Sequence, residues 1–183
     1  MASKVNGGEG PRIPWRLIGW ATPVGLLMIP WLAHFPWTLS DFIVAGAMFA
    51  IVGGTFELAV RASGNWAYRA GAAAALATAF LLTWVNLAVG IIGNEDNPLN
   101  LMFFGVTAAA LVGSIAVRFR ADGMTRAMSA AALIQALIGL GVLLSGAGDN
   151  EPPGPVGLFI LIELFAGLWL LSAWFFRKAA AAA

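Results

Sequence analysis

Residues 83–105, TWVNLAVGIIGNEDNPLNLMFFG, hold two apolar runs that are joined by a short polar segment. The polar segment, GNEDNPLN at 93–100, contains two acids, three asparagines and a proline. An apolar run that stops at turn-forming residues and then resumes is typical of two membrane-spanning helices with a tight connection. The stretch therefore predicts a helical hairpin in a bilayer. It also raises the question of whether its polar residues bind a ligand.

The composition of the whole chain extends this prediction. Of its 183 residues, 60% are hydrophobic and 10% are charged, whereas a soluble domain carries about 25% charged residues. We therefore expect an all-α, polytopic membrane protein with a single domain. The absence of cysteine excludes disulfides and thiolate metal sites. The single histidine, His34, argues against a multi-histidine metal or haem centre, so no metal or cofactor is expected.

Six apolar segments approach the roughly 20 residues that cross a bilayer. They are residues 15–35, 39–60, 68–92, 99–117, 127–144 and 156–176. We expect residues 1–14 to be a cytoplasmic segment, residues 15–178 a six-helix transmembrane domain and residues 179–183 an alanine tail. The first apolar segment has no small-residue cleavage site after it, so it is expected to be a retained span rather than a secretory signal.

The charged residues orient these six spans. Every basic side chain lies at the same side of the six spans, either outside them or at the first turn of a span: Lys4, Arg12, Arg16, Arg61, Arg69, Arg118, Arg120, Arg126, Arg177 and Lys178. The opposite loops hold acids and no basic residue: Asp41, Glu95, Asp96, Asp149 and Glu151. By the positive-inside rule, both termini are expected to be cytoplasmic.

An internal repeat with an offset of 57 residues accompanies this pattern. Ala59-Val60-Arg61 matches Ala116-Val117-Arg118, Arg69-Ala70 matches Arg126-Ala127, and Pro98 matches Pro155. The repeated unit is a helical hairpin, formed by spans two and three and again by spans four and five. Parallel repeats occur in some transporters, although a duplicated hairpin that only packs well explains the same pattern.

The acidic loops of the repeat have two interpretations. GNEDNP at 93–98, with Glu95 and Asp96, falls opposite NEPPGP at 150–155, which contains Glu151 and follows Asp149. Both loops are acidic, contain asparagine and close with a proline. Proline suits the first turn of a helix, and acids are favourable near a helix N-terminus, so a purely structural role is sufficient. Carboxylates and amide oxygens could instead form an outward-facing cation site.

Two acids lie within the predicted spans, where ionisable side chains are costly and are candidates for function. Glu57 precedes Arg61 by four residues, which predicts an ion pair on one helical face. Gly46, Ala50, Gly53 and Gly54 share that face, and small residues there allow another helix to approach closely.

Glu163 has no basic residue at its expected depth, eight residues after Pro155. Asn86, Thr107 and Gln135 are expected at a similar depth, about 10–15 Å from the outer ends of their helices. Thr83 and Asn86 share one helical face with Gly90 and Asn94. These side chains predict a polar layer around Glu163. Three roles remain open for it: hydrogen bonds between helices, a proton or solute site, and contact with a partner protein or lipid.

Three segments carry a resemblance to a known family. FELAVRASGNWAYRAG at 56–71, FLLTWVNLAVGIIGNEDNPLNLMFFGV at 80–106 and LVGSIAVRFRADGMTRAM at 111–128 resemble a family of uncharacterised small bacterial membrane proteins. The likeness covers residues 40–178. It implies a location in the bacterial cytoplasmic membrane, with no activity or functional residue to transfer.

Two classes of function follow from these observations. The first is a small proton- or cation-linked transporter or channel-like protein that uses Glu163. The second is an accessory or scaffold subunit that binds lipid, pigment or a larger membrane complex, and either class allows a homo-oligomer. The chain has no phosphate-binding loop, dinucleotide fingerprint or catalytic motif, and no basic patch interleaved with aromatic residues. We therefore expect neither an enzyme nor a nucleic-acid-binding protein.

Overall fold

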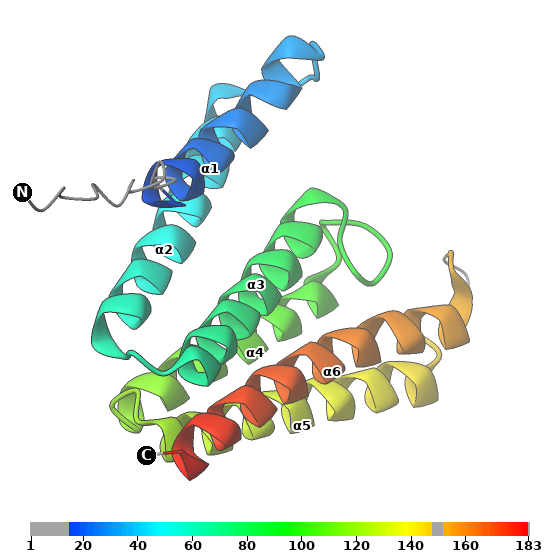
Figure 1. Cartoon of the computed structure of the whole chain (residues 1–183). Coiled ribbons are helices and arrows are strands. Elements are labelled where there is room, and N and C mark those ends of the chain that lie inside the picture. Colours follow the sequence, from blue (N-terminus) through cyan, green and yellow to red (C-terminus); the bar gives the residue numbers. More distant parts are fainter. Residues whose placement is uncertain (1–14, 148–151, 183) are drawn as a thin grey trace, which may run out of the picture. The chain divides into compact units, whose positions relative to one another are not determined.

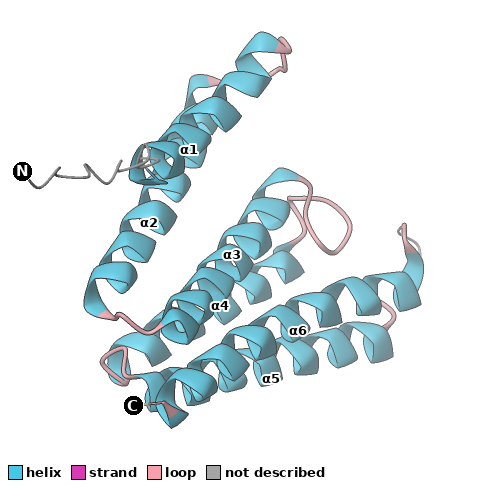
Figure 2. Ribbon diagram, viewed as in Figure 1, coloured by secondary structure: helices cyan, strands magenta, loops and turns pink. Residues whose placement is uncertain are grey.

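The computed structural model describes residues 15–147 and 152–182. These residues form six α-helices and one short 3-10 helix, with no strand in the described part (Figure 1, Figure 2). The helices are α1 (Trp15–Leu32), α2 (Leu39–Ala62), α3 (Trp66–Ala88), η1 (Pro98–Asn100), α4 (Leu101–Ala116), α5 (Ala121–Ser145) and α6 (Gly154–Ala181). The prediction of an all-α protein with six helices is confirmed.

Five segments are long and apolar enough to cross a membrane: α2, α3, η1 with α4, α5, and α6. The apolar stretch Leu17–Leu32 of α1 is shorter, and α1 ends at Leu32 rather than at residue 35, where the sequence predicted the span to end. The helices α5 and α6 run beyond the predicted spans into polar sequence, since a helix continues past the hydrocarbon core when its backbone bonds remain satisfied.

The chain divides into two compact units, residues 1–53 and residues 54–183, which are described separately. In the first unit, the Thr38 hydroxyl caps α2 by accepting a hydrogen bond from Asp41 N–H at 3.4 Å. In return, the Thr38 backbone N–H and hydroxyl donate to Asp41 Oδ2, at 2.7 and 2.8 Å. The Trp20 ring from α1 lies against Gly53, where a Cβ would be only 3.3 Å from the ring. The predicted close helix approach is therefore confirmed at Gly53.

In the second unit, α3, α4, α5 and α6 form a four-helix bundle in which each helix packs against two others. The helices α5 and α6 make the most extensive contact and run side by side (Figure 1). Successive helices are antiparallel, which short connections require. The interior holds large side chains from all four helices: Leu82, Phe103, Val106, Met128, Ile162, Trp169 and Phe176.

One end of this bundle is fastened by contacts among three segments. The Tyr68 hydroxyl of α3 donates to the Phe119 carbonyl in the turn between α4 and α5, at 2.8 Å. The Tyr68 ring meets the Phe176 ring edge-on, with centroids 5.2 Å apart. Ser172 of α6 also donates to the Gly71 carbonyl, at 2.8 Å. These contacts fix the register of α3 against α6.

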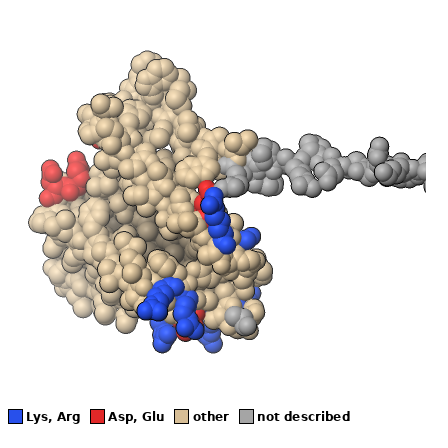
Figure 3. All heavy atoms as spheres, turned by 90° about the vertical axis from the view of Figure 1, so that its left-hand side faces the viewer, with Lys and Arg blue, Asp and Glu red and all other residues tan. Residues whose placement is uncertain are grey.

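The outer faces of the bundle carry large apolar side chains. Leu133, Leu137, Ile160 and Leu164 are all more than half exposed. Figure 3 shows a surface that is mostly uncharged, with basic and acidic residues in a few separate clusters. An apolar surface of this extent is unfavourable in water and is matched by lipid chains.

The two turns aligned by the 57-residue offset differ in local structure. Before α3, the Asn65 side chain accepts hydrogen bonds from Ala67 and Tyr68 N–H, whereas Arg120 before α5 makes no such cap. Arg69 donates to the carbonyls of Ser63 and Val60, at 2.8 and 3.0 Å. Its partner in the repeat, Arg126, pairs instead with Asp122 at 3.4 Å. The aligned arginines therefore have different partners.

Candidate functional site

The polar segment between α3 and α4 is organised around one buried side chain, Asn100. Its Oδ1 accepts hydrogen bonds from Ile91 and Ile92 N–H, at 3.1 and 2.9 Å. Its Nδ2 donates to the carbonyls of Ile92 and Asn94, at 3.3 and 2.7 Å. The turn also needs Gly90, whose φ is +73° and whose Cβ would collide with the Asn94 backbone at 2.4 Å. The Asn100 amide therefore has a complete set of partners.

The rest of the segment also has structural roles. Asn97 caps η1 by accepting a hydrogen bond from Leu99 N–H at 3.0 Å, and Pro98 occupies the first turn. The predicted position of proline at a helix start is therefore confirmed here. Glu95 and Asp96 are exposed on the turn. Asp149 and Glu151, the other two acids of the predicted outer loops, lie outside the described residues.

Asn86 belongs to this turn rather than to a layer around Glu163. Because α3 ends at Ala88 instead of residue 92, Asn86 lies in the last turn of the helix. Its Nδ2 donates to the Asn100 carbonyl at 2.8 Å. The Gly71–Ser172 hydrogen bond aligns the antiparallel helices α3 and α6. Measured along the helices from this bond, Asn86 lies six residues further than Glu163, or about 9 Å. The predicted continuous helical face from Thr83 to Asn94 is wrong, because α3 ends at Ala88.

Glu163 and Gln135 do come together, at the contact between α5 and α6. Gln135 is fully buried, and its Nε2 donates to the Ile162 carbonyl at 3.4 Å. One turn further along α5, a Cβ at Gly139 would lie 2.6 Å from Glu163 Oε1 and 3.0 Å from Ile162 Cγ2. The missing side chain at Gly139 thus makes the space in which the Glu163 carboxyl rests. We call Gln135, Gly139, Ile162 and Glu163 the α5–α6 seam.

Glu163 lies at the margin of the buried face of α6. It is half-buried, while its neighbours Ile160 and Leu164 are exposed and Ile162 is fully buried. Within the described residues, no side chain or backbone group forms a hydrogen bond or ion pair with its carboxyl. Glu163 lies about 14 Å along α6 from Gly154, the first residue of the helix. The depth of Glu163 in the membrane remains a prediction.

Other polar atoms in the bundle also lack partners. Within the described part of the chain, Gln135 Oε1, Trp169 Nε1 and Asn86 Oδ1 are buried without a hydrogen bond. An unpaired buried polar atom is costly, so each one calls for an explanation. Gln135 and Trp169 lie on α5 and α6, the two helices of the seam. Of these three atoms, Gln135 Oε1 is the one that belongs to the seam.

The remaining predicted residues have local roles or no assigned contact. Thr107 is half-buried and its hydroxyl donates to the Phe103 carbonyl of its own helix, at 3.4 Å. Thr83 is half-buried on α3. The Glu57–Arg61 ion pair is confirmed, with 2.6 Å between Arg61 Nη2 and Glu57 Oε1. These residues do not extend the seam.

The long apolar helices and their apolar outer faces decide the class of the molecule. The chain is an integral multi-pass membrane protein. No protein-family model, curated protein or solved structure matches it.

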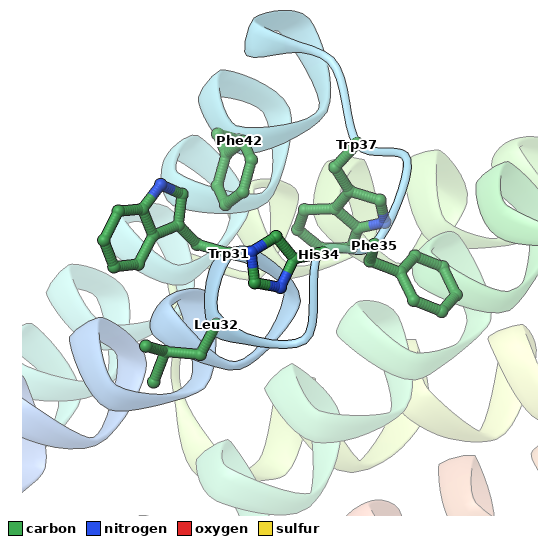
Figure 4. Close-up of a pocket in the computed structure, with 6 residues that line it drawn as sticks. All are labelled: Trp31, Leu32, His34, Phe35, Trp37 and Phe42. Atoms are coloured by element: carbon green, nitrogen blue, oxygen red, sulfur yellow. The ribbon is translucent and has the colours of Figure 1, made fainter.

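Two open pockets are lined by residues other than those of the seam. A pocket of about 540 Å³ surrounds the turn between α1 and α2 and is lined by Trp31, Leu32, His34, Phe35, Trp37 and Phe42 (Figure 4). A second, apolar groove of about 450 Å³ lies between the start of α4 and the end of α5, with Ser145 as its polar lining. Neither is lined by Glu163. The first is rich in tryptophan, which is typical of a membrane interface.

A metal centre finds no support in the described residues, where no three His, Asp or Glu side chains gather. Sequence analysis missed Gly139 and Asn100. Asn100 was visible as the last polar residue before a long apolar run, a position suited to a cap. The sequence does not distinguish Gly139 from other helical glycines, such as Gly141, that have open space where a Cβ would lie.

Proposed function

We propose that this membrane protein carries out proton- or cation-linked transport, with Glu163 as the group that exchanges the proton or cation. The observation that carries this proposal is the half-buried Glu163 carboxyl, which rests against Gly139 and has no hydrogen-bond partner in the described residues. An ionised carboxylate is unstable in hydrocarbon without a partner. Glu163 is therefore suited to exchange a proton or a cation at a point where water or a cation gains access to its carboxyl.

The test is proton flux into liposomes that contain the purified chain and a pH-sensitive dye. We expect flux with the wild type, loss of that flux in Glu163→Gln, and retained flux in Glu57→Gln. Glu57 is a matched control because it is also a carboxyl of a candidate span, yet it pairs with Arg61. Absence of flux from the wild type, or equal loss in both variants, contradicts the proposal.

A transport function agrees with the wider topology that we propose. In it, α1 is a sixth span, all basic residues lie on the cytoplasmic side, and both termini are cytoplasmic. The resemblance of residues 40–178 supports a bacterial cytoplasmic membrane. The helices α3 and α5 end at Ala88 and Ser145, 57 residues apart, which supports the duplicated hairpin. The different partners of Arg69 and Arg126 limit that duplication to the helices.

A second candidate is an accessory subunit in which Glu163 meets a polar group of a partner helix. The observation in its favour is Gly167, which is exposed one turn beyond Glu163 and would have open space around a Cβ. A small residue at this point lets another helix approach closely. In this case native mass spectrometry would show a stoichiometric oligomer or complex that Glu163→Gln dissociates, and liposomes would show no flux.

A further inference from the structure

Lys178 near the end of α6 is held by aromatic rings from two helices. Its Nζ lies 4.4 Å from the ring centroid of Trp174 and 5.6 Å from that of Trp66 on α3. Phe175 meets both tryptophans edge-on, with centroids 4.8 Å from Trp174 and 6.1 Å from Trp66. These four residues form what we call the Lys178 clamp. Cation–π contacts with two rings hold the ammonium group in place.

The positive charge around this clamp is not neutralised within the described chain. Neither Lys178 nor its neighbour Arg177 forms an ion pair with a described acid. The adjacent turn adds Arg118, Arg120 and Arg126, and its one acid, Asp122, serves both Arg120 and Arg126. Tyr68 joins this turn to α3 and α6 through Phe119 and Phe176. The end of the bundle therefore carries a strong excess of positive charge.

The helix dipole explains only part of this arrangement. A cation near the C-terminus of α6 is favourable, but the dipole does not require rings from a second helix. Lysine has three N–H donors and the rings are not acceptors of the usual kind. Trp66 and Trp174 are 64% and 49% exposed, so the clamp faces outward. Its donors are thus available to an anion at the surface.

The surface next to the clamp favours a ligand with an apolar part. Leu170 and Leu171 are exposed on α6, one turn closer to the middle of the helix than Trp174. We propose that the Lys178 clamp binds the phosphate of an anionic phospholipid, whose acyl chains lie along this apolar face of α6. Basic side chains near helix ends bind anionic lipid headgroups in this way.

The experiment is native mass spectrometry of the full chain in detergent, titrated with phosphatidylglycerol or phosphatidylcholine. We expect one phosphatidylglycerol to bind more tightly than phosphatidylcholine, and Lys178→Gln to weaken that binding about fivefold. The matched control is Arg120→Gln, which removes the same charge at the same end of the bundle but outside the clamp. It should change the affinity less than about twofold.

A second variant separates the clamp from charge alone. Trp174→Leu keeps Lys178 and an apolar side chain, so a loss of phosphatidylglycerol binding in this variant supports the clamp. Unchanged binding in Trp174→Leu overturns the proposal. Equal losses in Arg120→Gln and Lys178→Gln also overturn it, since they indicate a diffuse charge effect. Equal binding of both lipids, or displacement of phosphatidylglycerol by millimolar inorganic phosphate, excludes a specific lipid site.

Discussion

The turn around Asn100 and the α5–α6 seam both bury an amide side chain, but they satisfy it differently. Asn100 forms four hydrogen bonds through its amide group, all to backbone atoms of the turn. Gln135 forms a single long hydrogen bond to Ile162, and its Oε1 has no partner in the described residues. The first amide is part of the architecture of the turn. The Gln135 oxygen can still accept a hydrogen bond from a ligand, a water molecule or a protonated group.

This difference separates structural polar residues from functional candidates within one bundle. The acids and amides of 93–100 were conspicuous in the sequence, yet the asparagine side chains bond within the turn and the two acids are exposed on it. Glu163 is a lone acid in an apolar run, yet it rests on Gly139 with no hydrogen bond from any described residue. In a membrane interior, unsatisfied polar groups are expensive and are retained where they act. The seam is therefore the better candidate site.

The largest expected effect comes from breaking the Asn100 turn. Asn100→Ala leaves the Ile91 and Ile92 N–H groups without their acceptor, and the carbonyls of Ile92 and Asn94 without their donor. Since each unpaired buried group costs about 1–3 kcal/mol, we expect the free energy of unfolding to fall by about 3–5 kcal/mol. Unfolding by SDS titration in mixed micelles measures this change.

The control for that experiment is Asn97→Ala. Asn97 lies in the same turn, but it makes only one cap hydrogen bond, to Leu99 N–H. Its loss should cost about 1 kcal/mol. If Asn100→Ala destabilises the protein no more than Asn97→Ala does, the turn does not depend on the Asn100 amide.

An intermediate effect is expected at Gly139. In Gly139→Ala, the new Cβ would meet Glu163 Oε1 at 2.6 Å and Ile162 Cγ2 at 3.0 Å, so the carboxyl must move and the helices must adjust. We expect a loss of about 1–2 kcal/mol in unfolding free energy, because overpacking outweighs the higher helix propensity of alanine. The same SDS titration measures this loss.

Gly141→Ala is the matched control, on the same helix but with nothing within 4 Å of its Cβ. Alanine there should be neutral or stabilising by up to about 1 kcal/mol. Equal effects of the two alanines would show that Gly139 makes no close contact in the membrane. In the flux assay, Gly139→Ala should also reduce transport relative to Gly141→Ala, because it displaces the Glu163 carboxyl.

The features that the sequence could predict depend on short-range patterns. The lengths of the apolar runs predicted the long helices, and the i,i+4 spacing predicted the Glu57–Arg61 pair. The Thr38 cap and the Pro98 helix start follow the same local logic. Such features depend on neighbouring residues, so they do not require knowledge of how distant helices pack.

The features that the sequence could not predict depend on the turn geometry and on helix register. Asn86 bonds to the Asn100 carbonyl across a turn that Gly90 makes possible with its positive φ. Periodicity alone continued α3 for four more residues and so placed Asn86 at the depth of Glu163. The meeting of Gly139 with Glu163 depends on the register of α5 against α6. Many small residues on both helices leave that register open to sequence reasoning.

The smallest expected effect on stability is at Gln135, the buried amide of the seam. Gln135→Leu removes one hydrogen bond of 3.4 Å and an oxygen that has no partner among the described residues. Leucine is of similar size and suits the surrounding apolar core. Since replacing an unsatisfied polar group by an apolar one is nearly neutral or stabilising, the unfolding free energy should change by less than about 1 kcal/mol.

Asn86→Leu provides the contrast, because Asn86 Oδ1 also has no partner among the described residues but its Nδ2 forms a shorter hydrogen bond, 2.8 Å to the Asn100 carbonyl. That variant should lose about 1–2 kcal/mol. If Gln135→Leu costs as much as Asn86→Leu, then Gln135 Oε1 has a partner in the membrane, such as a bound water. A water molecule bound to Gln135 Oε1 would form part of a hydrogen-bonded path to Glu163. In that outcome Gln135→Leu should also slow proton flux, which the liposome assay measures directly.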